Sequence, residues 1–161
     1  FFKQKTAYEI YQCDWSSDVC SSDLKGLGEG HMLYVSMLKL KELFDFSKMN
    51  GRMFKLGGRC VLEPDFDISE YEGYEGKYIF KSRKSWQGPG IYLIDTRMYS
   101  WCFTLIDEYI DITLNKNPSC MRRGIDTEHS HFLNIPTEKL VEFEKLHVGC
   151  IVALTGQYVS D

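Results

Sequence analysis

Carboxylate side chains are concentrated in one stretch of the chain, residues 61–76, which contains no lysine or arginine. Asp65 and Asp67 form an Asp-x-Asp pair there, but the further ligand spacing of a calcium-binding loop is absent. An acidic loop can instead form an electronegative rim that captures a basic peptide. We therefore expect Asp65, Asp67 and Glu70 to bind a ligand; the alternative is a solvated loop. The acidic loop, as we call residues 63–75, carries Glu63, Asp65, Asp67, Glu70, Glu72 and Glu75.

Aromatic residues are dense beside and after this loop, and a small domain cannot bury all of them. Tyr71, Tyr74, Trp86 and Tyr99 fall in segments that we interpret as loops. Aromatic side chains with polar tips are favoured anchors at protein interfaces, so we expect these four to form an exposed binding groove. The alternative is that they fold over the ends of the core. The aromatic residues of this region are Tyr71, Tyr74, Tyr78, Phe80, Trp86, Tyr92, Tyr99, Trp101, Phe103 and Tyr109.

A group of basic residues follows the acidic loop, at Lys77, Lys81, Arg83 and Lys84, with Trp86 next to it. Positive charge combined with aromatic stacking is how proteins bind single-stranded nucleic acid. The formal net charge of −4 argues against a dedicated nucleic-acid-binding protein, which normally carries a basic excess. Nucleic-acid binding through Lys77, Lys81, Arg83 and Trp86 is therefore the alternative hypothesis, and a solvated strand face is the simpler interpretation.

One pattern resembles a metal site: His129-x-His131, with Cys120 and His147 at a distance. Zinc sites normally use closely spaced ligand pairs, and neither Cys-x-x-Cys nor His-x-x-x-His accompanies the two histidines. The sequence also lacks G-x-S-x-G, H-E-x-x-H and P-loop motifs. We therefore predict no metal and no cofactor. A small metal-dependent enzyme using His129 and His131 is a further alternative.

Four of the six cysteines, Cys60, Cys102, Cys120 and Cys150, are widely spaced, which is not typical of a disulfide framework. Three of them lie in apolar surroundings, where a free thiol behaves as a small hydrophobic side chain. With no signal peptide visible, we expect a cytoplasmic location. No apolar run approaches the roughly 18–20 residues that a membrane-spanning helix needs.

The N-terminal segment has a different character. KQKTAYEI at 3–10 and CDWSSDVCSSDL at 13–24 resemble the conceptual translation of short-read sequencing adaptors. The second string repeats a Ser-Ser-Asp unit and shows neither helical nor strand periodicity. The resemblance implies that residues 1–24 are an artefact and disordered. The alternative is a natural disordered tail.

Hydrophobic periodicity predicts the elements that position these residues. Residues 32–47 carry apolar side chains at helical spacing, at Leu33, Met37, Leu40 and Phe44. From residue 53 onward the period changes to two, which is typical of strands. We expect strands at 59–63, 77–83, 91–95, 101–106 and 109–114, a loop at 115–130, a helix at 137–147 and a strand at 148–154.

Residues 53–114 resemble an SH3-like small β-barrel of the kind common in prokaryotic and phage proteins. The resemblance is carried by FKLGGRCVL at 54–62, the acidic loop, GIYLID at 90–95 and CFTLIDEYIDI at 102–112. Gly58 departs from the pattern, because an acidic residue is frequent at that place. The resemblance implies a mainly β, α+β fold, with a closed barrel of about five short strands, flanking helices and a binding role without a defined ligand.

The chain thus divides into residues 1–24, a leader with an amphipathic helix at 25–52, the barrel at 53–114, and a loop, helix and strand at 115–161. KLHVGCI at 145–151 is similar to KLGGRCV at 55–61, so the last part is interpreted as a truncated second module or as a chance similarity. We predict a non-enzymatic module that binds a protein or peptide.

Overall fold

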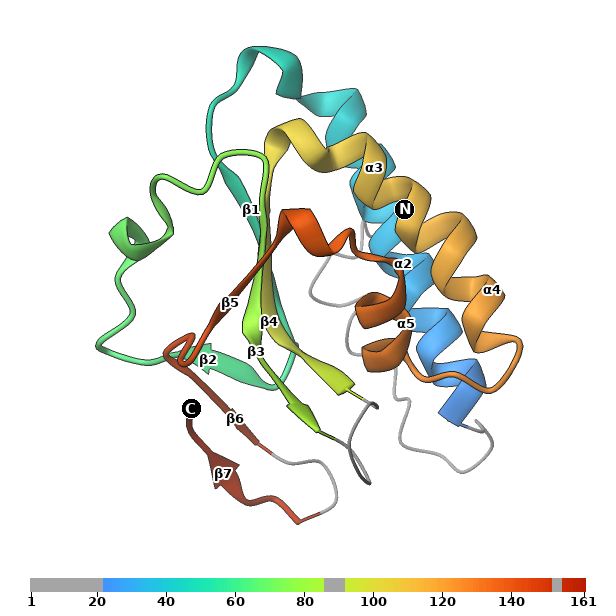
Figure 1. Cartoon of the computed structure of the whole chain (residues 1–161), viewed down its shortest axis with the longest axis vertical. Coiled ribbons are helices and arrows are strands. Elements are labelled where there is room, and N and C mark those ends of the chain that lie inside the picture. The colour runs from blue at the N-terminus through green and yellow to red at the C-terminus, as the bar shows by residue number, and fades with distance from the viewer. Residues whose placement is uncertain (1–21, 86–91, 152–154) are drawn as a thin grey trace, which may run out of the picture.

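The computed structural model describes residues 22–85, 92–151 and 155–161, which form a mixed α+β fold (Figure 1). A four-stranded sheet of order β1-β4-β3-β5 stands between a layer of helices and a three-stranded sheet of order β2-β6-β7. The α+β class expected from the sequence is confirmed, but the expectation of a mainly β fold is wrong, because the described residues contain more helix than strand. The two sheets are open, however, and the described residues do not form the closed barrel that the resemblance implied.

The larger sheet contains β1 (Arg52–Leu56), β3 (Tyr78–Ser85), β4 (Tyr92–Cys102) and β5 (Leu140–Phe143). Strand β4 pairs antiparallel with both β1 and β3, whereas β5 pairs parallel with β3. A parallel pairing needs a crossover connection, and the helices between β4 and β5 supply it. This connection places those helices on one face of the sheet (Figure 1).

The helical layer combines one long helix with several short ones. Helix α2 (Ser22–Leu43) includes most of the segment predicted as a helix at 32–47. Short 3₁₀ turns lie at Phe46–Lys48, Ile68–Tyr71, Phe103–Leu105 and Thr137–Lys139. The crossover consists of α3 (Ile106–Asp111), a π-helical turn (Ile112–Lys116), α4 (Asn117–Met121) and α5 (Thr127–Asn134).

Both faces of the larger sheet are buried. Tyr78, Phe80 and Trp101 belong to the core cluster that includes helix residues. Ile79 and Met98 belong to a second cluster, which includes residues of the small sheet. Because a strand alternates its side chains between faces, β3 carries one set of core residues on each side.

Several sequence predictions for the second half of the chain were wrong. The strand expected at 91–95 and the first two residues of the strand expected at 101–106 belong to one strand, β4, which ends at Cys102, and residues 103–105 form a 3₁₀ turn. The strand expected at 109–114 is helical, because Ile106, Tyr109 and Ile112 are buried at a spacing of three residues. Asp107 and Glu108 in the first turn also favour a helix N-terminus.

The loop predicted at 115–130 contains α4 and the start of α5. Asp126 caps α5 by accepting a hydrogen bond from the His129 backbone N–H at 2.8 Å. The helix predicted at 137–147 is a 3₁₀ turn followed by β5. In β5 the parallel pairing with β3 overrides the apparent helical spacing, since strand propensity depends strongly on tertiary context. The strand predicted at 148–154 is confirmed as β6 over its described part.

The small sheet consists of β2 (Cys60–Leu62), β6 (Val148–Ile151) and β7 (Tyr158–Val159), all antiparallel. Cys60 and Cys150 face each other directly in the β2–β6 register and form a disulfide. This corrects the prediction that the cysteines are free thiols, which holds only for the buried Cys102 and Cys120. The two similar sequences at 55–61 and 145–151 thus meet in one sheet. In the described part of the chain, no helix is long and apolar enough to cross a membrane.

Candidate functional site

The central strand of the small sheet, β6, buries one of its faces, whereas Leu62 of β2 and Val159 of β7 are 48% and 37% exposed on that same side. Val148 and Cys150 are 1% and 6% exposed and contribute to the second core cluster. Other side chains alternate with these two along β6 or lie on the neighbouring strands and point to the other face. They are Val61, Ile151 and Tyr158, which are 55%, 51% and 51% exposed. The solvent face of an antiparallel sheet is normally polar, so three large apolar side chains there are notable. We call this surface the outer face; it comprises Arg59, Val61, Glu63, Gly149, Ile151 and Tyr158.

A hydrogen bond crosses the outer face from one strand to another. The Tyr158 hydroxyl donates to Glu63 Oε1 at 2.5 Å, and this bond raises the pKa of Tyr158. A Cβ atom at Gly149 would overlap both the tyrosine hydroxyl and the Glu63 carboxylate. Glycine at this position is therefore what allows Tyr158 to lie across β6.

Acidic side chains gather at one end of the outer face. The Glu63 backbone N–H donates to the His147 carbonyl at 2.9 Å, which continues the β2–β6 pairing beyond Leu62. The His147 ring lies 2.8 Å from an Asp65 carboxylate oxygen and 3.8 Å from a Glu70 oxygen. The start of the acidic loop is thereby held beside β6. Arg59, at the opposite end of β2, is exposed.

Two of the three predicted acidic ligands, Asp65 and Glu70, thus lie next to the outer face. Asp67 has a different position, because it caps the 3₁₀ turn and accepts the Ser69 backbone N–H at 2.9 Å. That hydrogen bond lowers the pKa of Asp67. Asp67 therefore shapes the loop.

The predicted aromatic groove is not formed by the residues that the sequence indicated. Tyr71 and Tyr99 are only 3% and 2% exposed, so the exposure expected for them is wrong. Tyr71 packs with Phe54 and Phe143, and Tyr99 stacks on Phe80. Both rings are buried because each face of the larger sheet is covered.

Tyr74 is half-buried and packs edge-on against Phe143. Trp86 lies outside the described residues. An aromatic residue that does lie on an exposed face of the small sheet is Tyr158, which the sequence did not indicate. The run VGCI at 148–151 is apolar at almost every position, so its period could not indicate which side faces solvent.

The predicted basic face is interrupted at Lys81, which is 8% exposed and paired with Asp161 at 2.5 Å. The expectation that Lys81 faces solvent is therefore wrong. The Lys77 ammonium donates to the Glu138 carbonyl at 2.7 Å. The Arg83 side chain, like Trp86, is outside what the structure describes.

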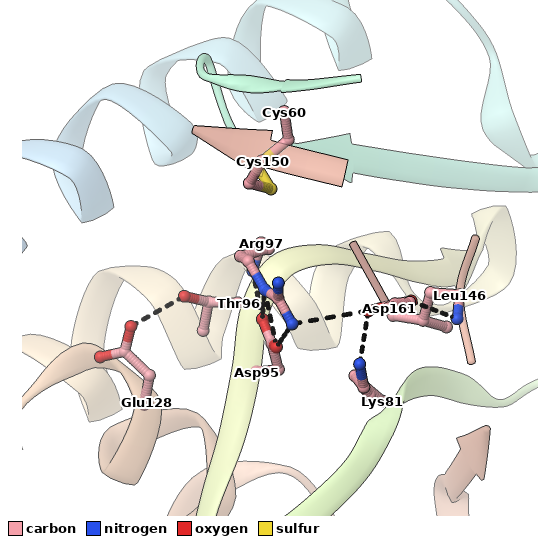
Figure 2. Close-up of polar contacts among 9 residues, drawn as sticks. All are labelled: Cys60, Lys81, Asp95, Thr96, Arg97, Glu128, Leu146, Cys150 and Asp161. Atoms are coloured by element: carbon pink, nitrogen blue, oxygen red, sulfur yellow. Dashed lines mark hydrogen bonds and ion pairs between the residues drawn. A yellow bond between two sulfur atoms is a disulfide. The ribbon is translucent and has the colours of Figure 1, made fainter. Parts of the chain in front are cut away.

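Lys81 belongs to an ionic cluster between the two sheets (Figure 2). The Arg97 guanidinium contacts Asp95 at 2.5 Å and Asp161 at 3.5 Å, and the Leu146 N–H donates to Asp161 at 2.6 Å. Burial of the Asp161 carboxyl raises its pKa, but the hydrogen bonds from Lys81 and Leu146 and the two cations prevail and lower it. Every charge in this cluster has a partner, so the cluster fastens Asp161 to the sheets.

The two histidines of the candidate metal site lie on α5, where residues two positions apart point in nearly opposite directions. His129 contacts Asp126 at 2.9 Å, and the buried His131 contacts the Tyr109 hydroxyl at 3.2 Å. Burial lowers the pKa of His131 to about 4. Within residues 22–85, 92–151 and 155–161, no group of three or more His, Cys, Asp or Glu side chains could hold a metal ion.

Comparisons with protein-family models, with curated proteins and with solved structures find no match to this chain. The outer face and its surroundings are therefore the candidate functional site.

Proposed function

We propose that this protein is a protein-binding module that docks a partner segment on its outer face. The observation that carries the proposal is the gathering of exposed Val61, Ile151 and Tyr158 beside Glu63 and the start of the acidic loop. An exposed apolar patch with a polar rim is typical of a protein-interaction site. This is the binding role that the resemblance to SH3-like modules implied, and we propose that Tyr158 supplies the aromatic contact with the partner.

The partner we propose is an extended segment that carries alternating apolar and basic side chains. Its apolar side chains would cover Val61 and Ile151, and burial of apolar surface contributes about 25 cal/mol per Å². Its basic side chains would face Glu63, Asp65 and Glu70. Charges at the edge of an interface mainly raise the association rate and the salt dependence of binding.

A binding role agrees better than catalysis with where the perturbed groups lie. Tyr109 and His131, whose pKa values burial shifts strongly, are 0% and 3% exposed inside the core. A substrate could not reach them there. The outer face, by contrast, is accessible over three strands.

The experiment is an NMR titration of the oxidised protein with a short blocked peptide of alternating lysine and valine. We expect amide shifts confined to residues 59–63, 149–151 and 158–159, and weaker binding at higher salt. A matched peptide with glutamate in place of lysine is the control and should cause no such shifts. Absence of shifts up to about 1 mM basic peptide, which corresponds to about −4 kcal/mol, would refute the proposal. Shifts centred on another surface would refute it as well.

A further inference from the structure

The outer face is assembled from three short strands that are far apart in the sequence. Strand β2 supplies Val61, and Glu63 follows it directly; β6 supplies Gly149 and Ile151, and β7 supplies Tyr158. Cys60 and Cys150 each come one residue before an exposed apolar residue, and their disulfide joins β2 to β6 on the side opposite the outer face. The bridge lies next to the Arg97 region of β4 (Figure 2). It therefore holds the two halves of the face in register.

We propose that this disulfide is a redox gate for the outer face: the oxidised protein presents the complete face, and reduction releases β6 and β7 from β2. The proposal rests on the proposed function, since it concerns the regulation of the same surface. Disulfides persist in oxidising compartments and are opened by glutathione and thioredoxin in reducing ones. The face would thus be complete only under oxidising conditions.

The remaining contacts between β2 and β6 are few. Strand β2 has three residues and β6 has four, and the pairing is extended by two backbone bonds, Glu63 N–H to His147 and Ile151 N–H to Arg59. Strand β7 pairs only with β6 among the described strands, and the Tyr158–Glu63 hydrogen bond is its side-chain link to the residues that follow β2.

The ionic cluster makes the release local. Residue Leu146 precedes β6 and Asp161 follows β7, and the Leu146 N–H donates to the Asp161 carboxylate at 2.6 Å. Asp161 is in turn held by Lys81 and Arg97. The start of β6 and the end of β7 are thereby fastened to the larger sheet at one point. Opening of the bridge loosens β6 and β7 from β2 and leaves the contact between Leu146 and Asp161 in place.

Reduction is a thiol–disulfide exchange with a dithiol reductant. Cys60 is partly exposed and Cys150 is 6% exposed, so the reductant thiolate attacks Cys60 Sγ. A mixed disulfide forms there, and Cys150 leaves as a thiolate that takes up a proton. The second thiol of the reductant then displaces Cys60, which is also protonated. Two electrons pass to the protein, and the reductant ends as a disulfide.

The test compares the oxidised and the dithiol-reduced protein in two measurements: affinity for the lysine–valine peptide and amide hydrogen exchange. If β6 and β7 remain paired with β2 for only about a tenth of the time after reduction, the apparent affinity for the peptide falls about tenfold. We expect that loss together with faster exchange at 148–151 and 158–159 and unchanged exchange in β3 and β4. The C60S/C150S variant should behave as the reduced protein and should not respond to reductant, which excludes effects through Cys102 and Cys120.

Equal affinity and equal exchange in the two redox forms would overturn the gate and leave the proposed function intact. Loss of protection throughout β3 and β4 on reduction would also overturn it, because the bridge would then hold the whole fold. If the oxidised protein does not bind the peptide, the proposed function itself fails, and the gate fails with it.

Discussion

Acidification should destabilise the protein through one buried histidine, His131. Its Nδ1 lies 2.8 Å from the Thr127 carbonyl, which can only accept, so Nδ1 carries the proton. Its Nε2 lies 3.2 Å from the Tyr109 hydroxyl and accepts from it. The Tyr109 oxygen in turn contacts the Tyr99 hydroxyl at 2.6 Å. The network is satisfied by a neutral imidazole, and a second proton on the ring would break it.

The magnitude follows from the difference in pKa between the two states. The pKa of His131 is about 4 in the fold, because burial disfavours the charged ring, against 6.5 in the unfolded chain. Above pH 6.5 both states are neutral and protonation has no effect on stability. Below it the unfolded chain gains the proton first, which costs about 1.4 kcal/mol per pH unit down to the folded pKa. At about pH 5 the expected loss is about 2 kcal/mol.

Urea denaturation followed by tryptophan fluorescence at about pH 7.5 and about pH 5 measures this loss. In H131Q, the decrease in unfolding free energy between the two pH values should be about 2 kcal/mol smaller than in the wild type. The matched control is H31Q, which changes an exposed histidine on α2 and should keep the wild-type decrease. A decrease of the same size in H131Q and wild type would refute the account of the buried network.

Three further perturbations have defined outcomes. K81M removes the cation that contacts Asp161 in the buried cluster and should lower the unfolding free energy by about 3 kcal/mol. Part of this loss should be restored in K81M/D161N. If the effects of K81M and D161N were fully additive in urea denaturation, the pairing of Lys81 with Asp161 would be contradicted. D126A removes the cap of α5 and should cost about 1 kcal/mol in the same assay; no change would mean that the cap contributes nothing. G149A displaces Tyr158 and should abolish peptide binding while changing stability by less than about 1 kcal/mol, since the displaced groups are flexible and exposed; unaltered binding by G149A would count against the outer face.

Local periodicity correctly predicted those elements whose type, helix or strand, was not overridden by contacts with distant segments. The alternation around Tyr78 and Phe80 correctly indicated β3, and the spacing of Leu33, Met37 and Leu40 correctly indicated part of α2. The prediction divided strand β4 in two, because residues 96–100 were interpreted as a loop. That segment is a strand because β1 pairs with it along its second half.

The rest depends on contacts between distant parts of the chain. Residues 140–143 form a strand only because β3 is available as a parallel neighbour. The pairing of Cys60 with Cys150 joins positions 90 residues apart, and four cysteines allow three pairings that the sequence cannot distinguish. The acidic side of the candidate site was predictable from composition. Its apolar side was not, because the exposure of Ile151 and Tyr158 depends on which face of β6 meets the core.

The most direct measurement is the affinity of the lysine–valine peptide for two matched variants of the oxidised protein. I151Q changes an apolar side chain of the outer face that is 51% exposed, and L133Q changes one on α5 that is 58% exposed. We expect an affinity loss of about tenfold for I151Q, equivalent to about 1.4 kcal/mol, and a loss below about twofold for L133Q. Wild-type affinity in I151Q, or an equal loss in both variants, would contradict the proposed function.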